Sequence, residues 1–210
     1  MLQLYWANAG QMDLRAPAPL SDYRKERLAK LKPEQARKSS LCAELLLIEA
    51  VKREEPAHRL PLEIVADENG KPGFSQGKPF FSLSHSGVYA ACALASFPVG
   101  LDIQTLSNCH EALIRRFFTA GEQAEILSAE DRDAAFTRLW CRKESFLKAI
   151  GLGLRLDLRS FDVSGADPRP SYEGCAYAFW DHREGELFFS VCVPQDRAGE
   201  AFPPPITRLP

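Results

Sequence analysis

Hydrophobic and polar positions recur with two different periods along this chain, and the change of period predicts its elements. Helical spacing in residues 33–53 and 131–150 predicts two long helices, and apolar runs in residues 79–95 and 176–193 predict strands after each of them. The first residues, LQLYWA, alternate like a further strand. A long helix followed by strands in each half of the chain favours an α+β class over an alternating α/β one.

The second predicted helix carries the most informative segment of the chain, which reads WCRKESFLKAIGLGL over residues 140–154. Trp140, Glu144 and Lys148 are spaced by four and therefore lie along one flank of the helix. A Glu and a Lys at this spacing are most often a solvated surface pair. The Gly-Leu-Gly sequence that follows predicts that the helix ends just past Lys148. The apolar side of the helix comprises Phe136, Leu139, Trp140, Leu147 and Ile150.

One charged residue of this helix falls within its apolar side. Lys143 lies four residues after Leu139 and four before Leu147. A long charged side chain is seldom placed in an apolar stripe without a partner. The segment therefore differs from an ordinary solvated helix face.

Upstream, residues 89–103 read YAACALASFPVGLDI, which are two apolar runs separated by a Ser-Phe-Pro turn. This pattern predicts an antiparallel strand pair. Strand alternation places Asp102 and Gln104 on one face, beside Gly100. The two polar residues are either a polar strand end or, since carboxylate and amide oxygens suit a hard divalent cation, part of a metal site.

Between these regions, residues 69–87 read NGKPGFSQGKPFFSLSHSG. Asn-Gly at its start predicts a hairpin turn, and Lys71 follows that turn directly. Residues 80–83 are predicted to form a short strand with Ser84 and His85 in its polar exit. Hydroxyl, imidazole and backbone N–H groups at such a strand end can receive a phosphate, with Lys71 supplying charge. The alternative is a hydrogen-bonded turn beside a solvated lysine.

Taken in order, the blocks GKP, SLSHSG, GLDI, RRFFTAGE and WCRKESFLKAIGLGL give the chain a close resemblance to the Sfp-type 4'-phosphopantetheinyl transferase family. The resemblance extends over residues 69–163, including the trailing LDLRSFDV, and is weak over about the first sixty and the last forty residues. One W-x-x-K-E is common in proteins. Five blocks in the right order and spacing are a specific signature.

The resemblance implies a fold of two pseudo-symmetric α+β lobes, with the active site in the cleft between them. Residues 1–98 would form the lobe with the coenzyme A nucleotide contacts, and residues 99–210 the lobe with the metal, the catalytic helix and carrier docking. The implied reaction is a magnesium-dependent transfer of the phosphopantetheine arm of coenzyme A to a serine hydroxyl of an apo acyl or peptidyl carrier protein. Adenosine 3',5'-bisphosphate would be released.

The resemblance also implies roles for individual residues. Asp102 and Glu144 match the metal ligands of the family, and Glu144 is also the natural general base for the carrier serine. Lys148 matches the lysine that meets the phosphates and would stabilise the leaving one. Gln104 departs from the family pattern, in which many members have a second acid, so either a water takes that metal position or Gln104 orients one.

Further residues would contact coenzyme A. Lys143 is expected in the same charge cluster as Lys148, Ser84 and His85 match the element that contacts the ribose 3'-phosphate, and Lys71 matches a lysine near the nucleotide. Basic residues of the N-terminal third are also candidates for the 3'-phosphate, although a solvated helix face is the simpler interpretation of each one alone. These candidates are Lys30, Lys32, Arg37 and Lys38.

The carrier is expected to dock between Thr105 and Thr119. This stretch contains two arginines followed by two phenylalanines, a combination that suits an acidic helical partner. In the alternative, both phenylalanines are core residues and both arginines are solvated. The four residues are Arg115, Arg116, Phe117 and Phe118.

Composition agrees with these expectations. A chain of 210 residues with 45% hydrophobic content can form one large domain or two small lobes with a core. Its net charge of −2 gives no reason to expect nucleic acid, no apolar run approaches bilayer length, and no signal sequence is recognisable, so we expect a cytoplasmic monomer. The Pro-rich residues 202–210 are expected to form an extended end.

Six cysteines occur without a CxxC or a zinc-site spacing, and we expect reduced thiols, with Cys92 and Cys192 as small core residues. Two other classes of function compete with the transferase. A non-catalytic coenzyme A or nucleotide-binding module would keep Lys71, Ser84 and His85 without needing the acid and lysine of the helix. A carrier-binding protein without activity would keep the docking strip and lose the acids.

Overall fold

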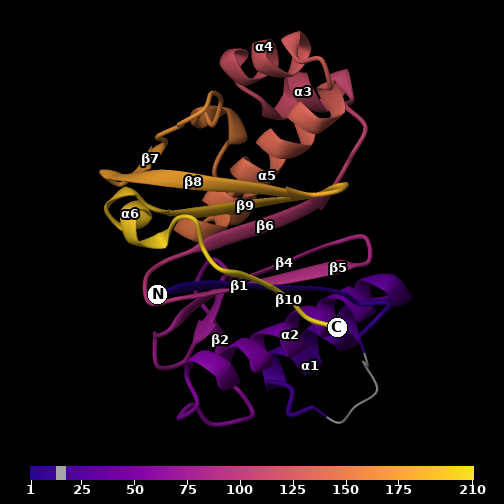
Figure 1. Cartoon of the computed structure of the whole chain (residues 1–210), viewed down its shortest axis with the longest axis vertical. Helices are drawn as coiled ribbons and strands as arrows, with labels where there is room; N and C mark the ends of the chain where they lie inside the picture. Colours follow the sequence, from indigo (N-terminus) through magenta and orange to yellow (C-terminus); the bar gives the residue numbers. More distant parts are fainter. Residues whose placement is uncertain (13–17) are drawn as a thin grey trace. The chain divides into compact units, whose positions relative to one another are not determined.

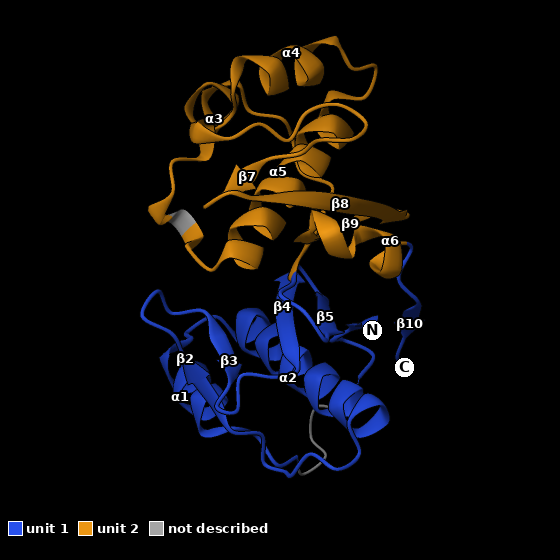
Figure 2. Ribbon diagram, turned by 90° about the vertical axis from the view of Figure 1, so that its left-hand side faces the viewer, with its two compact units in different colours: residues 1–99, 203–210 blue, residues 100–202 orange. Residues whose placement is uncertain are grey.

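The computed structural model describes residues 1–12 and 18–210, apart from the side chain of residue 154. The chain forms two compact units, residues 1–99 with 203–210 and residues 100–202, coloured separately in Figure 2. Each unit contains a four-stranded sheet and one long helix, so the α+β class is confirmed. The tail differs from the expected division. Residues 203–210 belong to the first unit because β10 (Ile206–Arg208) pairs in parallel with its first strand.

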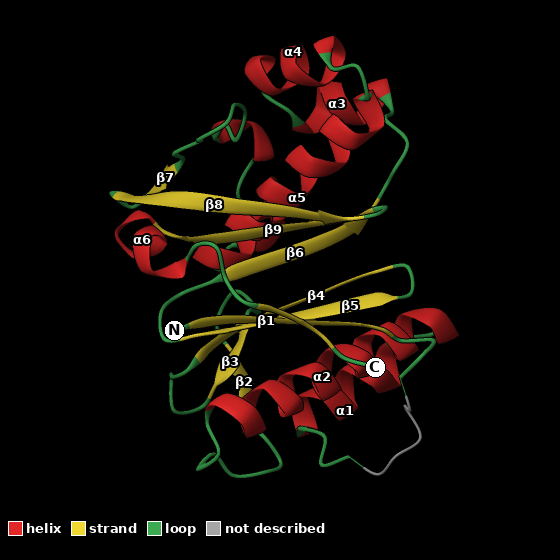
Figure 3. Cartoon of the chain, viewed as in Figure 1, coloured by secondary structure: helices red, strands yellow, loops and turns green. Residues whose placement is uncertain are grey.

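The first unit is a sheet with the order β10-β1-β5-β4, in which β1 (Leu2–Asn8), β5 (Tyr89–Ala95) and β4 (Phe80–Ser86) are antiparallel neighbours. The predicted first helix is α2 (Glu34–Glu54), which packs along one face of this sheet (Figures 1 and 3). Their shared core is built from small and branched side chains. Its fully buried members include Ala7, Cys42, Leu46, Leu47, Ala50, Ala90, Cys92 and Leu94.

Two smaller pieces complete the first unit. α1 (Asp22–Lys30) is joined to α2 by a buried ion pair between Arg24 and Glu44, whose Nε and Oε2 atoms are 3.1 Å apart. β2 (Ile64–Ala66) and β3 (Pro72–Phe74) form the predicted Asn-Gly hairpin. Its turn contains Gly70 at a φ of 87°, a conformation that glycine adopts without a steric penalty.

Two expectations about strands are wrong. The apolar runs on either side of the Ser-Phe-Pro turn do not pair with each other, because β5 already has β1 and β4 on its two edges and β6 (Gly100–Thr105) pairs with β9 (Leu187–Pro194). In addition, Ser84 and His85 lie within β4 and not in its exit. The ladder between β4 and β5 continues to the pair Ser86 and Tyr89, and the chain turns at the two residues between them.

The second unit has the strand order β6-β9-β8-β7 and a layer of helices. Its long helix is α5 (Arg132–Ile150), which packs on β6 and β9 (Figure 3). The remaining elements of this unit are β7 (Ser171–Tyr172), β8 (Cys175–Glu184), α3 (Glu111–Phe117), α4 (Ala120–Ser128), α6 (Ala198–Ala201) and the 3-10 turns η1 (Gly153–Arg155), η2 (Leu158–Ser160) and η3 (Gln195–Arg197).

The bounds of α5 follow from its end residues, as the sequence predicts. Asp131 is the N-cap, and its carboxylate accepts the backbone N–H of Ala134. Gly151 ends the helix at a φ of 79°. On the apolar side, Leu139 and Leu147 are completely buried. The prediction of this helix is therefore confirmed.

No helix in the described residues is both long and apolar enough to cross a membrane. All six cysteines are free thiols, as expected. Cys92 and Cys192 are completely buried core residues.

The contact between α5 and β6 leads to the first prediction. A Cβ added to Gly100 would lie 1.9 Å from the carbonyl oxygen of Ser145 and 2.4 Å from the backbone nitrogen of Ala149. Since both atoms are backbone, the helix itself would have to move. We expect Gly100→Ala to lower the free energy of unfolding by about 3 kcal/mol or more in urea denaturation. Gly199→Ala is the control, because its Cβ would meet no atom within 4 Å.

Candidate functional site

Three charged side chains meet where β6 lies against α5. Asp102 on β6 is buried, with 6% of its surface exposed. Its Oδ1 accepts a hydrogen bond from the Lys148 ammonium at 2.7 Å. Glu144 lies one turn before Lys148 on the same flank of α5 and is half-buried. The structure thus brings together the acid of the strand and the acid and lysine of the helix.

The surroundings of Glu144 disfavour the ionised form of its carboxyl group. Burial raises the pKa of its carboxyl group, and the negative charge of Asp102 raises it further, whereas the Lys148 ammonium lowers it. Among the described residues, none makes a hydrogen bond or an ion pair with the Glu144 side chain. The carboxylate is therefore held in a partly desolvated place without a donor, unlike Asp102.

A cysteine that the sequence did not single out completes this flank. Cys141 is buried, three residues before Glu144, and its thiol donates to the carbonyl oxygen of Phe188 over 3.8 Å. Burial and the negative charge of Asp102 raise the pKa of the thiol, which stays protonated. The helical spacing of 141, 144 and 148 could have identified it.

Gln104 lies two residues beyond Asp102 on the same face of β6, the face that turns toward α5. Asp102 is opposite Ser190 in the ladder with β9, and Gln104 is opposite Phe188. The amide nitrogen of Gln104 points to Ser107 Oγ at 3.5 Å. The amide oxygen accepts no hydrogen bond from the described residues, so it is available to a ligand.

The oxygen donors of Asp102, Glu144 and Gln104 are of the kind that a hard divalent cation prefers. Asp102, Glu144 and Lys148 carry a formal charge of −1 together, and the charge of Asp102 helps to raise the pKa of Glu144. A cation beside them would lower that pKa. The described residues contain no cluster of three or more His, Cys, Asp or Glu side chains able to hold a metal. Two acids and an amide fit magnesium, which keeps several waters and binds substrate phosphates.

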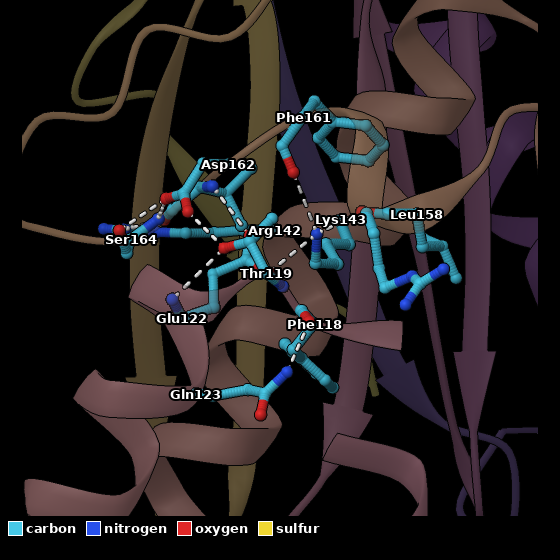
Figure 4. Close-up of polar contacts among 12 residues, drawn as sticks. Phe118, Thr119, Glu122, Gln123, Arg142, Lys143, Leu158, Phe161, Asp162 and Ser164 are labelled. Carbon is cyan, nitrogen blue, oxygen red and sulfur yellow. Dashed lines mark hydrogen bonds and ion pairs between the residues drawn. The ribbon is translucent and has the colours of Figure 1, made fainter. Parts of the chain in front are cut away.

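Lys143 does not belong to this cluster, contrary to our expectation. Its side chain is completely buried, and its ammonium lies 2.8 Å from the Glu122 carboxylate. Figure 4 shows the two residues within a set of polar contacts between α4, α5 and the segment after α5. Consecutive helical residues point about 100° apart, so Lys143 and Glu144 face different neighbours. The sequence argument that Lys143 needs a partner is confirmed.

In the first unit, the residues expected near the nucleotide lie on β4 and after the β2–β3 turn. Ser84 is 5% exposed, whereas its neighbour His85 is exposed. Leu83 packs with the core that contains α2, so strand alternation turns Ser84 to the opposite face and His85 to the α2 side. Lys71 is half-buried directly after the hairpin turn. One ligand group cannot meet both side chains of the Ser84 and His85 pair from one face.

The start of α2 lies beside the turn that follows His85. Ser39 Oγ donates to the carbonyl oxygen of Gly87 at 2.9 Å, and this hydrogen bond joins α2 to the turn between β4 and β5. Arg37 and Lys38 on this part of α2 are exposed, and Lys38 forms a surface ion pair with Glu34. The other two basic candidates, Lys30 and Lys32, are exposed as well.

The expected docking strip is divided between core and surface. Phe118 is completely buried, as the alternative expectation has it. Phe117 is half-buried, and its ring centroid lies 5.7 Å from that of Trp140. Arg116 is exposed and lies over the Phe117 ring, while Arg115 pairs with Glu111 on the surface of α3.

Residues 98–192 match the family model of the 4'-phosphopantetheinyl transferase superfamily. The chain is 41% identical over 110 residues to the 4'-phosphopantetheinyl transferase psf-1 of Bacillus pumilus, which covers 50% of this chain and 47% of that protein. It is 30% identical over 148 residues to the 4'-phosphopantetheinyl transferase Sfp of Bacillus subtilis (strain 168), covering 69% and 66%. A further Bacillus subtilis 4'-phosphopantetheinyl transferase is 29% identical over 197 residues, covering 89% and 87%. The matches to psf-1 and Sfp thus span about half and about two thirds of those proteins.

The raised pKa of Glu144 predicts a pH dependence of stability. The folded protein holds this proton more tightly than the unfolded chain, so the contribution of Glu144 to stability falls as pH rises from its ordinary value of 4.5 through the raised pKa. We therefore expect Glu144→Gln to be more stable than the parent at pH 7 to 8 with chelator present. The difference should shrink toward pH 4.

Thermal unfolding from pH 4 to pH 8 checks this, since each kcal/mol corresponds to roughly 2–4 °C for a chain of this size. Glu130→Gln is the matched control, because Glu130 is exposed. A Glu144→Gln variant that melts below the parent at pH 8 would contradict the electrostatic account.

Proposed function

We propose a function from the premise that this chain belongs to the 4'-phosphopantetheinyl transferase superfamily: it transfers the 4'-phosphopantetheine arm of coenzyme A to a serine of an apo acyl or peptidyl carrier protein. The serine oxygen forms a bond to the phosphorus next to pantetheine, and the bond from that phosphorus to the bridging oxygen breaks. Adenosine 3',5'-bisphosphate leaves. The observation that carries this proposal is the meeting of Asp102, Glu144 and Lys148.

Charge balance supports a magnesium ion at these residues. Asp102 and Glu144 would hold it, and Gln104 would contribute its amide oxygen or orient a bound water. Magnesium would neutralise the diphosphate of coenzyme A and so make its phosphorus easier to attack. Without the ion, Asp102, Glu144 and Lys148 carry a formal charge of −1 together. They therefore attract a dication and would repel a diphosphate that has no metal bound.

Glu144 is the proposed general base for the carrier serine. A carboxylate whose pKa is raised by burial takes up a proton more readily at neutral pH than an ordinary one. Lys148 is the proposed stabiliser of the leaving phosphate, since its ammonium lies on the same flank and is held by Asp102 at 2.7 Å.

The first unit is proposed to bind the nucleotide of coenzyme A. Lys71 and His85 would supply charge and hydrogen-bond donors to its phosphates. Ser84 is proposed to contribute through its strand backbone, because its side chain points to the opposite face from His85. Arg37, exposed on α2 near the turn after His85, is the basic candidate best placed for the 3'-phosphate.

The carrier is proposed to dock on α3 and the residues around it. This surface combines the exposed side chains of Leu113 and Arg116 with the half-buried Phe117. An apolar centre with a basic rim suits an acidic helix. The reaction and the six free cysteines are consistent with a cytoplasmic protein.

The reaction itself is the third prediction. With magnesium and coenzyme A, the protein should add one phosphopantetheine to an apo carrier, as measured by intact mass. Lys148→Ala should lower turnover on the order of 10²-fold or more, because it removes a charge that stabilises the transition state. Lys52→Ala, an exposed lysine of α2, is the control.

No adduct on acyl and peptidyl carriers of several classes, with folded protein, would refute the proposed activity. A binding module without activity would instead show a coenzyme A thermal shift and unmodified carriers.

The fourth prediction concerns the position where the chain departs from its family's common pattern. Gln104→Glu places a second anionic oxygen beside Asp102, so we expect half-maximal activity at a lower magnesium concentration. Initial rates titrated with magnesium at saturating coenzyme A and carrier measure this. An unchanged or higher requirement would show that residue 104 does not act on the metal.

A further inference from the structure

The buried ammonium of Lys143 holds the segment that follows α5. It donates to the carbonyl oxygens of Leu158 at 2.5 Å and Phe161 at 3.2 Å, and it lies 4.4 Å from the centroid of the Phe161 ring. Its carboxylate partner, Glu122, is also completely buried. All the donors of a primary ammonium are therefore used inside the protein, and none is left for a ligand.

Glu122 binds the same segment from the other side of the ion pair. Its two carboxylate oxygens accept the backbone N–H groups of Thr119 and Val163, both at 2.8 Å. Thr119 is the N-cap of α4, so Glu122 connects the start of that helix to the segment. Figure 4 shows these contacts converging from α4, α5 and the loop.

Arg142, the residue before Lys143, holds the next part of the segment. Its Nη1 donates to the carbonyl oxygens of Val163 at 2.9 Å and Gly165 at 2.7 Å. Its Nε donates to Asp181 on β8 at 2.7 Å. Arg142 and Lys143 together thus donate hydrogen bonds to four carbonyl groups of residues 158–165, two each.

This segment has little regular structure of its own. In the part of the chain that the structure describes, residues 158–165 form one 3-10 turn, η2, and join no sheet. Side chains of α5 therefore supply hydrogen-bond partners to the backbone of the segment, as neighbouring strands do in a sheet. The same contacts connect α5 to the segment and to α4.

We propose that Arg142 and Lys143 are positioning residues for the proposed transfer: by anchoring residues 158–165 to α5, they fix the rotation at which Glu144 and Lys148 face Asp102. The proposal rests on the proposed function. It assigns the lysine of the W-x-x-K-E motif to helix placement and not to a phosphate contact.

A fully buried ion pair is a poor source of net stability, because the desolvation of both charges offsets most of their attraction. Removing one partner leaves a buried charge, so single variants would test stability and not position. The double variant Lys143→Met with Glu122→Gln removes both charges. Methionine keeps the length of the side chain, and glutamine keeps one oxygen, which can accept one of the two backbone N–H groups.

Hydrogen exchange, manganese binding and kinetics on the full chain test the proposal. In the double variant we expect residues 158–165 to exchange at least about tenfold faster than in the parent. Manganese, used as a spin probe for the metal site, should bind at least about threefold more weakly. Turnover should fall by about 10²-fold, since small displacements of catalytic groups have effects of this size, with little change in the KM for coenzyme A.

Arg159→Met is the matched control, because Arg159 lies in the same segment but is exposed. It should leave all three readouts at parental values. Arg142→Lys keeps the positive charge but loses the planar guanidinium group with its several N–H donors. It is the alternative test if the double variant does not fold. It should speed exchange around residues 163–165 and lower turnover.

Parental exchange of residues 158–165 in the folded variants would overturn the proposal. So would faster exchange with parental manganese binding and parental turnover. If the parent protein transfers nothing, the proposed function fails, while exchange and manganese binding still decide whether these residues set the geometry of Glu144 and Asp102.

Discussion

α5 lies so close to β6 at Gly100 that the backbone of the helix occupies the place of a side chain on the strand. The geometry of the candidate site depends on this contact. Two residues farther along the strand, Asp102 reaches the ammonium of Lys148 without a long side chain of its own. With any larger residue at position 100, the helix would stand farther from the strand, and the short aspartate would lose its partner on α5. The glycine thus belongs to the site although it has no functional group.

α5 carries two groups of charged residues that differ in how well their charges are paired. Around Lys143, each charge has a full set of hydrogen-bond partners inside the protein. Around Glu144, two acids share one lysine, and burial raises the pKa of the one without a donor. The first arrangement is complete as it stands. The second leaves the Glu144 carboxylate without a donor, which is the expected difference between a structural and a functional cluster.

The sequence predicted the long helices and most strands well, because these depend on local patterns. Asp131 and Gly151 mark the ends of α5, and apolar spacing marks its buried side. Strand pairing was less predictable. The two runs on either side of the Ser-Phe-Pro turn look like a hairpin locally, yet β5 gains partners on both edges from β1 and β4. Which distant strand takes an edge depends on long-range packing, and a short window of sequence does not contain that information.

The candidate site shows the same limit at the level of single residues. Spacing by four correctly grouped Glu144 with Lys148, and strand alternation correctly placed Gln104 on the face of Asp102. The resemblance places Lys143 beside Lys148 because it is next to Glu144 in the motif, but neighbouring residues on a helix point about 100° apart. Its position inside the apolar stripe already indicated a buried partner, but Glu122 could not be identified, because it lies on another helix. A short motif on a helix can therefore combine two roles, and only the periodicity, read residue by residue, separates the side chains that face the reaction from those that hold the helix in place.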